Sequence, residues 1–191
     1  MIRRRDMADR LRQRQKGYSM TDNYADYTTP GMDFEDSHRI TDILQVRLHA
    51  LNDLHLTLKH AHWNVVGPEF ISVHEMLDPQ VDEVRAWADL VAERIATMGA
   101  SPKGTPGAIV TGRTWEDYPV NRGSTLAHIS ALNDVYTGVI EDFRNAIAET
   151  GKADPMTEDI LVEVTRGLEL FQWFLRSFIT KSDGTLSPVS E

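Results

Sequence analysis

Five side chains in the middle of the chain have the types and spacing of metal ligands: His62, His74, Asp78, Asp89 and Glu93. His74 and Asp78 are four residues apart, as are Asp89 and Glu93, so each pair shares one face of a helix. Eleven residues separate Asp78 from Asp89, which is about 20° from three full turns, so both pairs point the same way. The same eleven residues rise about 16 Å, whereas metal ligands lie within about 2.0–2.6 Å of the ion. One helix therefore cannot bring both pairs to a single metal.

A second copy of the chain removes this difficulty. If two copies of the helix cross antiparallel about a two-fold axis near residue 83 or 84, the first pair of one copy faces the second pair of the other. His62, at the end of the preceding helix, then joins the first pair. We predict two intersubunit sites per dimer, each with two imidazoles and three carboxylates. Mixed nitrogen and oxygen ligands without thiolate suit Fe(II), Mn(II) or Zn(II), and open coordination positions permit redox chemistry.

Other aromatic and histidine side chains have simpler interpretations. A single histidine on a helix is more often a surface or core residue than a ligand. This interpretation applies to five histidines: His38, His49, His55, His60 and His128. The indole of Trp63, beside His62, would relay an electron and limit the escape of a radical. The remaining tryptophans are interpreted as packing residues: Trp87, Trp115 and Trp173. The Glu-x-x-His spacing of buried di-iron sites occurs once, at the start of the first helix, so a site within one bundle is not expected.

Long helices would position these residues, because apolar side chains recur three and four residues apart through most of the chain. The stripes predict helices from about 37 to the Gly67-Pro68 pair, then over about 69–98, 124–149 and 155–179. Residues 18–35 are expected to form an extended lead-in. The pattern predicts an all-α fold, a four-helix bundle with a crossover.

Two local features of this bundle are less regular. Pro79 lies inside the second helix and predicts a kink there or a restart around Asp78. The long connection between the second and third helices begins with a turn-rich segment, 101–113. We expect one short extra helix after it, in TWEDYPV (114–120).

Composition indicates one globular domain with a charged tail. The chain has 191 residues, a net charge of −9 and no cysteine, which excludes disulfides, thiolate ligands and thiol catalysis and fits a reducing intracellular setting. No run of eighteen apolar residues is long enough for a membrane span, and the N-terminal segment lacks the apolar core of a secretory signal. Residues 1–20 carry seven basic and two acidic side chains, so an otherwise acidic protein has a basic tail. An alternative start at Met20 would leave this segment without a role.

The motif HWNVVGPEFISVHEMLD (62–78), followed by DLVAER (89–94), resembles the signature of the Dps family, the DNA-binding proteins from starved cells or mini-ferritins. The similarity covers roughly residues 36–180, and LHLTLKHAHWNVVGP and SPKGTPGAI are most similar to the actinobacterial branch. The resemblance implies a ferritin-like bundle that assembles into a hollow homo-dodecamer. It also implies oxidation of Fe(II), preferably with hydrogen peroxide rather than dioxygen, and storage of a ferric mineral. His62, His74 and Asp78 would be ligands from one subunit, and Asp89 and Glu93 from its partner.

The resemblance also directs attention to charged residues outside that site. Acidic channels at a three-fold axis would admit iron, and four acids near the start of the last helix are candidates: Asp154, Glu158, Asp159 and Glu163. These acids would alternatively complement the helix dipole. DNA would be bound without sequence specificity by the basic side chains of the N-terminal segment: Arg3, Arg4, Arg5, Arg10, Arg12, Arg14 and Lys16. The C-terminal tail KSDGTLSPVSE has one lysine against two acids and is a poor candidate.

The favoured interpretation is therefore an iron-storage and DNA-protection protein with ferroxidase activity. It comprises a tail (1–35), a Dps bundle (36–181) and a short C-terminal tail (182–191). Iron is the expected metal, with Zn²⁺ or Mn²⁺ as alternative occupants, and the expected location is the cytoplasm, with the nucleoid if DNA is bound. One alternative is a structural nucleoid protein whose cage mainly compacts DNA. Another is a metal-dependent hydrolase that uses the same site to activate water.

Overall fold

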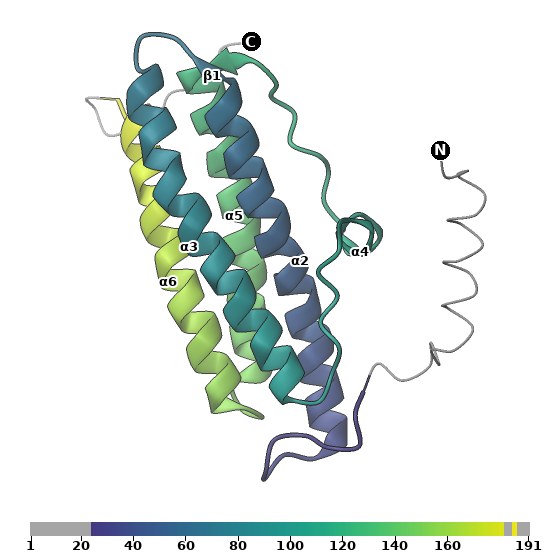
Figure 1. Ribbon diagram of the computed structural model, residues 1–191. Coiled ribbons are helices and arrows are strands. Elements are labelled where there is room, and N and C mark those ends of the chain that lie inside the picture. The colour runs from purple at the N-terminus through teal and green to yellow at the C-terminus, as the bar shows by residue number, and fades with distance from the viewer. Residues whose placement is uncertain (1–23, 182–184, 187–191) are drawn as a thin grey trace, which may run out of the picture.

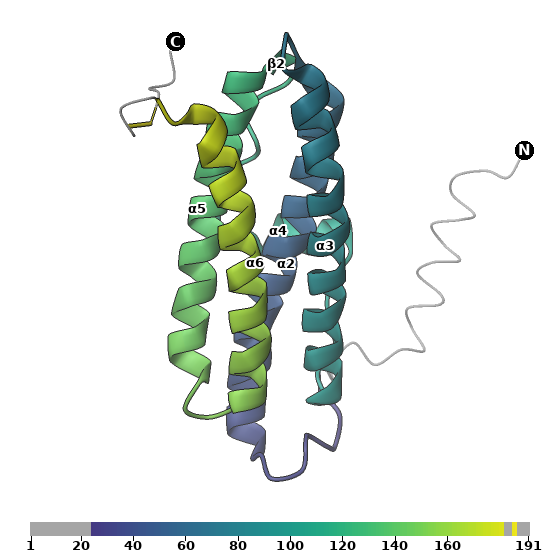
Figure 2. The same ribbon diagram turned by 90° about the vertical axis from the view of Figure 1, so that its left-hand side faces the viewer.

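Four long helices lie side by side in the computed structural model, which describes residues 24–181 and 185–186 (Figures 1 and 2). They are α2 (Phe34–Asn64), α3 (Phe70–Thr97), α5 (Thr125–Thr150) and α6 (Pro155–Ile179). α2 and α3 form one antiparallel hairpin, α5 and α6 form another, and a long connection joins the two pairs (Figure 1). The predicted all-α four-helix bundle is confirmed.

The helix ends follow local signals in the sequence. Asp33 and Ser124 are the N-caps of α2 and α5, where their side chains accept hydrogen bonds from the backbone N–H groups of Asp36 and Ala127. Because Asp33 caps α2, this helix begins at Phe34, a few residues before the start predicted near residue 37. Beyond the end of α3, Gly99 has a φ of 86°, the left-handed conformation that favours glycine after a helix.

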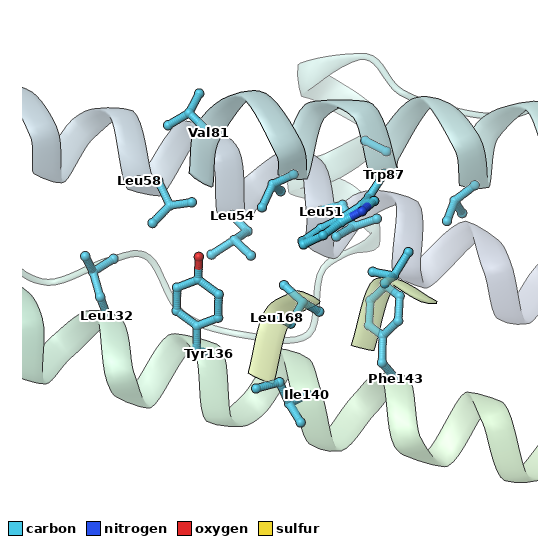
Figure 3. Packing of buried hydrophobic residues seen from close by; sticks show 14 of the residues in the cluster. Leu51, Leu54, Leu58, Val81, Trp87, Leu132, Tyr136, Ile140, Phe143 and Leu168 are labelled. Carbon is cyan, nitrogen blue, oxygen red and sulfur yellow. The ribbon is translucent and has the colours of Figure 1, made fainter. Parts of the chain in front are cut away.

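Apolar side chains from all four helices fill the interior. Figure 3 shows part of this core, in which Leu51, Leu54 and Leu58 of α2 lie near Tyr136 of α5. The buried Tyr136 hydroxyl donates a hydrogen bond to Gln80 Oε1 of α3 at 2.8 Å, so its one polar group is satisfied.

Only one of the three tryptophans expected to pack does so deeply. Trp87 is buried against α6, where a Cβ built on Gly167 would lie only 2.2 Å from its ring, so glycine permits this close approach. Trp115 is half-buried and donates to Asp53, whereas Trp173 is 60% exposed in the single chain. The packing interpretation of Trp173 is therefore wrong within one subunit.

The short helix of the connection occupies a different segment from the predicted one. It is α4 (Pro106–Gly112), and residues 114–120 are not helical. Pro106 occupies the first turn of α4, where its missing N–H costs nothing, and Ile109 is buried beneath it. In the predicted segment, Pro119 interrupts helical hydrogen bonding, and the Trp115 indole bonds to α2 instead.

The path of α3 at Pro79 differs from the prediction, and a short strand pair was not predicted. α3 runs unbroken through Pro79, so the predicted restart near Asp78 is wrong. Pro79 has no N–H group, so the carbonyl oxygen of Glu75, four residues earlier, loses its helical hydrogen bond. Both residues are exposed, so water can donate a hydrogen bond to this carbonyl instead. β1 (Val65–Val66) and β2 (Gly123–Ser124) form a short parallel pair that brings the end of α2 to the start of α5.

The lead-in to the bundle is described from Tyr24 onward. Residues 24–33 contain no helix, and Tyr24 pairs with Ala100 after the end of α3, in agreement with an extended lead-in. Within the described part of the chain, no helix is both long and apolar enough to cross a membrane.

Candidate metal centre

His62 and His74 form a reciprocal pair between the end of α2 and the start of α3. Their rings stack with centroids 3.6 Å apart and planes inclined by 22°. His62 Nδ1 lies 2.8 Å from the carbonyl oxygen of His74, and His74 Nδ1 lies 3.0 Å from the carbonyl oxygen of His62. Each helix thus holds the histidine of the other in place.

These two contacts determine which ring nitrogens can bind a metal. A carbonyl oxygen only accepts hydrogen bonds, so both Nδ1 atoms must carry the proton and donate it. In the neutral rings, the lone pair is then on both Nε2 atoms. A metal-binding histidine commonly donates its other ring N–H to a carbonyl or carboxylate in this way.

A carboxylate lies beside the histidine pair. Asp78, one turn after His74 on α3, places Oδ1 3.3 Å from His62 Nδ1, and its side chain is half exposed. The three residues of the predicted first half-site therefore lie close together within one chain, with Asp78 on the Nδ1 side of the His62 ring.

Two residues of this half-site were not identified in the sequence. The Lys59 ammonium lies 2.5 Å from Asp78 Oδ1, and this hydrogen bond is the main reason that the pKa of Asp78 is lowered. The Phe70 ring lies 5.0 Å from the His74 ring, centroid to centroid. Lys59 precedes His62 by three residues and Phe70 precedes His74 by four, so helical spacing was the available signal.

Asp89 and Glu93 form the second predicted half, further along α3. Both side chains are exposed, and neither has a hydrogen-bond or ion-pair partner in the described part of the chain. Asp89 borders a cavity of about 290 Å³ with His55 and Arg85. Burial, and then the positive charge of Arg85, lower the pKa of His55.

The two halves do not meet within one subunit. Among residues 24–181 and 185–186, no group of three or more His, Asp or Glu side chains is arranged to hold a metal ion. Convergence of the two halves across a two-fold axis therefore remains a prediction about a second copy.

Trp63 points away from its neighbour in sequence. Its side chain is 71% exposed, whereas His62 is only 5% exposed, because consecutive helical residues differ by about 100° in direction. A relay through this indole likewise remains a prediction.

Most of the other histidines have structural contacts. His49 lies 3.0 Å from both Gln45 Nε2 and the carbonyl oxygen of Lys103, and His60 lies 2.9 Å from that of Val120. His128 is fully buried, with Nδ1 2.9 Å from the Tyr118 hydroxyl, and the His38 ring contacts that of Tyr24 in a tilted arrangement with centroids 3.7 Å apart. These contacts agree with their interpretation as surface or core residues rather than ligands.

The four acids proposed for iron passage have different environments. Asp159 and Glu163 are exposed on α6, and Glu158 is half-buried. Asp154 is 5% exposed, caps α6 through the backbone N–H of Thr157, and pairs with Arg94 of α3 at 2.5 Å. Because this carboxylate faces the protein interior, we remove it from the candidate passage.

Asp154 is instead expected to stabilise the bundle. Burial alone would raise its pKa, but hydrogen bonds from Thr157 and Arg94 outweigh burial, so the pKa is lowered. Asp154→Ala would leave the Arg94 guanidinium, whose side chain is only 13% exposed, without its partner and should lower the free energy of unfolding by about 3–5 kcal/mol. Asp33→Ala, which removes only an exposed cap, should cost about 1 kcal/mol.

Urea unfolding followed by circular dichroism, at one fixed protein concentration, would measure both changes. Folding lowers the pKa of Asp154 below its value in the unfolded chain. The carboxylate therefore contributes its full share to stability above the ordinary carboxyl pKa. This stability is lost as the pH falls through the lowered pKa of the folded state. The free energies of unfolding of the unmodified chain and of Asp154→Ala should therefore differ most near neutral pH, and this difference should shrink towards pH 3. An equal difference at both pH values would contradict this role.

The candidate DNA-binding side chains lie outside the described residues: Arg3, Arg4, Arg5, Arg10, Arg12, Arg14 and Lys16.

Comparisons with known proteins agree on one family. The ferritin-like domain family matches residues 41–184. The DNA protection during starvation protein of Mycolicibacterium smegmatis is 53% identical over 161 residues, which cover 84% of this chain and 88% of that protein. The solved structure of Mycobacterium smegmatis Dps in a tetragonal form covers 85% of this chain and 99% of its own, with 53% identity and a TM-score of 0.84. DpsA14 from Streptomyces coelicolor covers 88% of this chain and 100% of its own, with 55% identity and a TM-score of 0.85.

Proposed function

This chain belongs to the Dps family of ferritin-like proteins, and we propose that it oxidises Fe(II) at sites shared between two subunits and stores the ferric product. The observation that carries this proposal is the reciprocal His62–His74 pair, in which both Nδ1–H groups are held by carbonyl oxygens and both Nε2 lone pairs remain for a metal, with the Asp78 carboxylate 3.3 Å from His62 Nδ1. Two neutral imidazoles and a carboxylate are suitable ligands for Fe(II).

In the proposed reaction, iron is the substrate. The two Nε2 atoms and Asp78 would bind Fe(II), and the ion would replace the Lys59 ammonium as the partner of Asp78. The exposed Asp89 and Glu93 of a second copy would complete the site. Zn²⁺ or Mn²⁺ would compete for the same ligands.

Hydrogen peroxide is the proposed oxidant. Two Fe(II) ions each give one electron to one H₂O₂ molecule, the O–O bond breaks, and the products are two Fe(III) and two hydroxide ions. Because both electrons reach the peroxide together, no hydroxyl radical is released. Dioxygen is the alternative oxidant. Trp63, beside His62 in sequence, would relay an electron and limit the escape of a radical.

We further propose that twelve copies form a hollow cage in which the ferric mineral collects. Asp159, Glu163 and Glu158 would attract Fe²⁺ to a passage through the shell. The N-terminal basic residues would hold the cage on DNA, in keeping with the name of the mycobacterial relative, DNA protection during starvation protein. The proposed location is the cytoplasm, and the nucleoid where DNA is bound.

Single substitutions in either half-site should abolish rapid iron oxidation. His74→Gln or Glu93→Gln removes one ligand and should slow oxidation by at least about 10–100-fold, because even the loss of a residue that only orients a metal ligand typically costs that much. The measurement is anaerobic loading with Fe(II), then a peroxide pulse, with ferric absorbance and particle mass recorded together.

Matched substitutions away from the site provide the controls. His38→Gln and Glu141→Gln replace a histidine on α2 and an exposed glutamate on α5, and both should oxidise iron at the unmodified rate. If Glu93→Gln also oxidised iron at that rate, the proposed shared site would be wrong.

A further inference from the structure

A second cavity lies between α2, α5 and the connection that follows α4. Its volume is about 600 Å³, within the usual range of about 300–1,000 Å³ for small-molecule sites. The connection from α4 to β2 passes beside α2 (Figure 1) and contributes Trp115, Tyr118 and Pro119 to the wall.

Two helix faces form the apolar sides of this cavity. Val46, Ala50 and Leu54 follow one another at intervals of four residues along α2. Val135 and Val139 have the same spacing on α5. Because residues four apart share a helix face, these side chains provide two facing apolar stripes.

A glycine keeps the space between the stripes open. Gly138 lies in the interior of α5, where glycine costs about 0.5–1 kcal/mol relative to alanine. A Cβ built at this position meets nothing within 4 Å, so crowding does not require glycine there. The residue thus enlarges a cavity that a larger side chain would fill.

The charge of the cavity is strongly one-sided. Its lining contains five carboxylates and no lysine, arginine or histidine: Asp53, Glu116, Asp117, Asp134 and Asp142. Arg113, beside the cavity, pairs with Asp117 at 2.5 Å and lies 3.6 Å from Asp53. Arg47 pairs with Asp142 at 2.8 Å. Two arginines therefore face five acids.

Glu116 and Asp134 both lack a hydrogen-bond or ion-pair partner among the described residues, but Glu116 still interacts electrostatically with Arg113, which leaves Asp134 as the uncompensated acid. It is exposed and has no hydrogen-bond or ion-pair partner among the residues that the structure describes. It precedes Gly138 by four residues and so shares its face of α5. Asp142, the next residue of that face, is already neutralised by Arg47. A cation would consequently bind at the Asp134 end.

We propose that this cavity binds a small amphiphilic amine, with a protonated nitrogen and an apolar body. The ammonium group donates to the Asp134 carboxylate, and the apolar body lies between the α2 and α5 stripes. The rings of Trp115 and Tyr118 add a further preference for a cation. Anions are repelled by the same five acids.

The test uses three anthracene probes that share one body and differ in charge. Binding of 9-aminomethylanthracene, 9-anthracenemethanol and 9-anthracenecarboxylate to the assembled, iron-free full chain is followed by anthracene fluorescence. The amine should saturate at one site per subunit and bind at least about tenfold more tightly than the carboxylate, as expected for a hydrogen bond between charged groups. Equal affinity for amine and carboxylate, or no saturable binding of the amine, would overturn the proposal.

Three variants test the location of the site. Asp134→Asn should weaken binding of the amine about tenfold. Gly138→Leu should abolish saturable binding because its side chain fills the cavity. Gly138→Ala is the matched control and should keep the affinity and the fold, since its Cβ has free space. Unchanged binding by a folded Gly138→Leu protein would place the site elsewhere and contradict the proposal.

Two other occupants of the cavity give distinct results. If a chain without residues 1–19 binds the amine at least about tenfold more tightly than the full chain, the basic segment of the protein itself fills the cavity. If only dissociated subunits bind the amine, a second copy covers the cavity. Either result would overturn a site for a free small molecule.

Discussion

Coexpression of two inactive variants is expected to restore about a quarter of the iron-oxidation sites of the unmodified protein. One variant carries His62→Gln and His74→Gln, and the other carries Asp89→Asn and Glu93→Gln. In a mixed dimer, the intact histidines of one subunit meet the intact acids of the other at one of the two sites. Random pairing makes about half of the dimers mixed, so about a quarter of all sites are complete.

The measurement is the rate of ferric absorbance after a peroxide pulse, per subunit, in cages purified through a different tag on each variant. Cages of either variant alone should be inactive. The same two variants mixed after assembly should also be inactive, provided that subunits do not exchange. If coexpression restores no activity although both variants enter the same cages, the shared site is refuted.

A second mixture distinguishes a shared site from one within a single chain. Here the unmodified chain is coexpressed one-to-one with a chain that carries all four substitutions. For shared sites, only dimers of two unmodified chains are active, so about a quarter of the sites remain. Sites contained within one chain would leave one half active, and that result would contradict the proposal.

The helices were predictable because their signals are local. The stripe from residue 155 to 179 and Pro155 at its start predicted α6 with the bounds observed. Gly99 likewise marked the end of α3. The short helix was misplaced because two competing segments of the connection have weak patterns. Contacts with α2, such as the hydrogen bond from Trp115 to Asp53, hold the predicted segment in a non-helical conformation.

The proximity of His62, His74 and Asp78 was predictable from the sequence, but the contacts between them were not. The four-residue spacing of His74 and Asp78 is enough to indicate a common helix face. The reciprocal bonds between His62 and His74, by contrast, depend on how α2 packs on α3, which spacing along one helix does not determine. The ion pair of Lys59 with Asp78 joins the same two helices and was missed for the same reason.

Exposure of large apolar side chains also depends on contacts that one chain does not contain. Trp63, Phe70 and Ile71 are exposed around the end of α2 and the start of α3, next to the histidine pair. Exposed apolar patches of this kind often mark protein–protein interfaces. A second copy that covered this region would place its own acids near the histidines, as the shared site requires.

Removal of residues 1–19 is expected to abolish DNA binding at low salt while leaving iron oxidation unchanged. This segment carries seven basic and two acidic side chains, whereas the rest of the chain is strongly acidic and would repel DNA. A protein that makes six to ten phosphate contacts loses about 10³–10⁵ in affinity between 50 and 200 mM salt. Gel shifts of linear DNA over that range should show the same steep decline for the full chain.

A full-length variant with its seven basic residues replaced by glutamine separates charge from length. It should behave like the truncated chain, because phosphate contacts require positive charge and neutral side chains release no counterions. Retained peroxide-driven iron oxidation in both proteins would show that the cage is intact. If either protein shifts DNA as the full chain does at about 50 mM salt, another surface binds DNA. The segment would then have no part in protecting it, as an alternative start at Met20 implies.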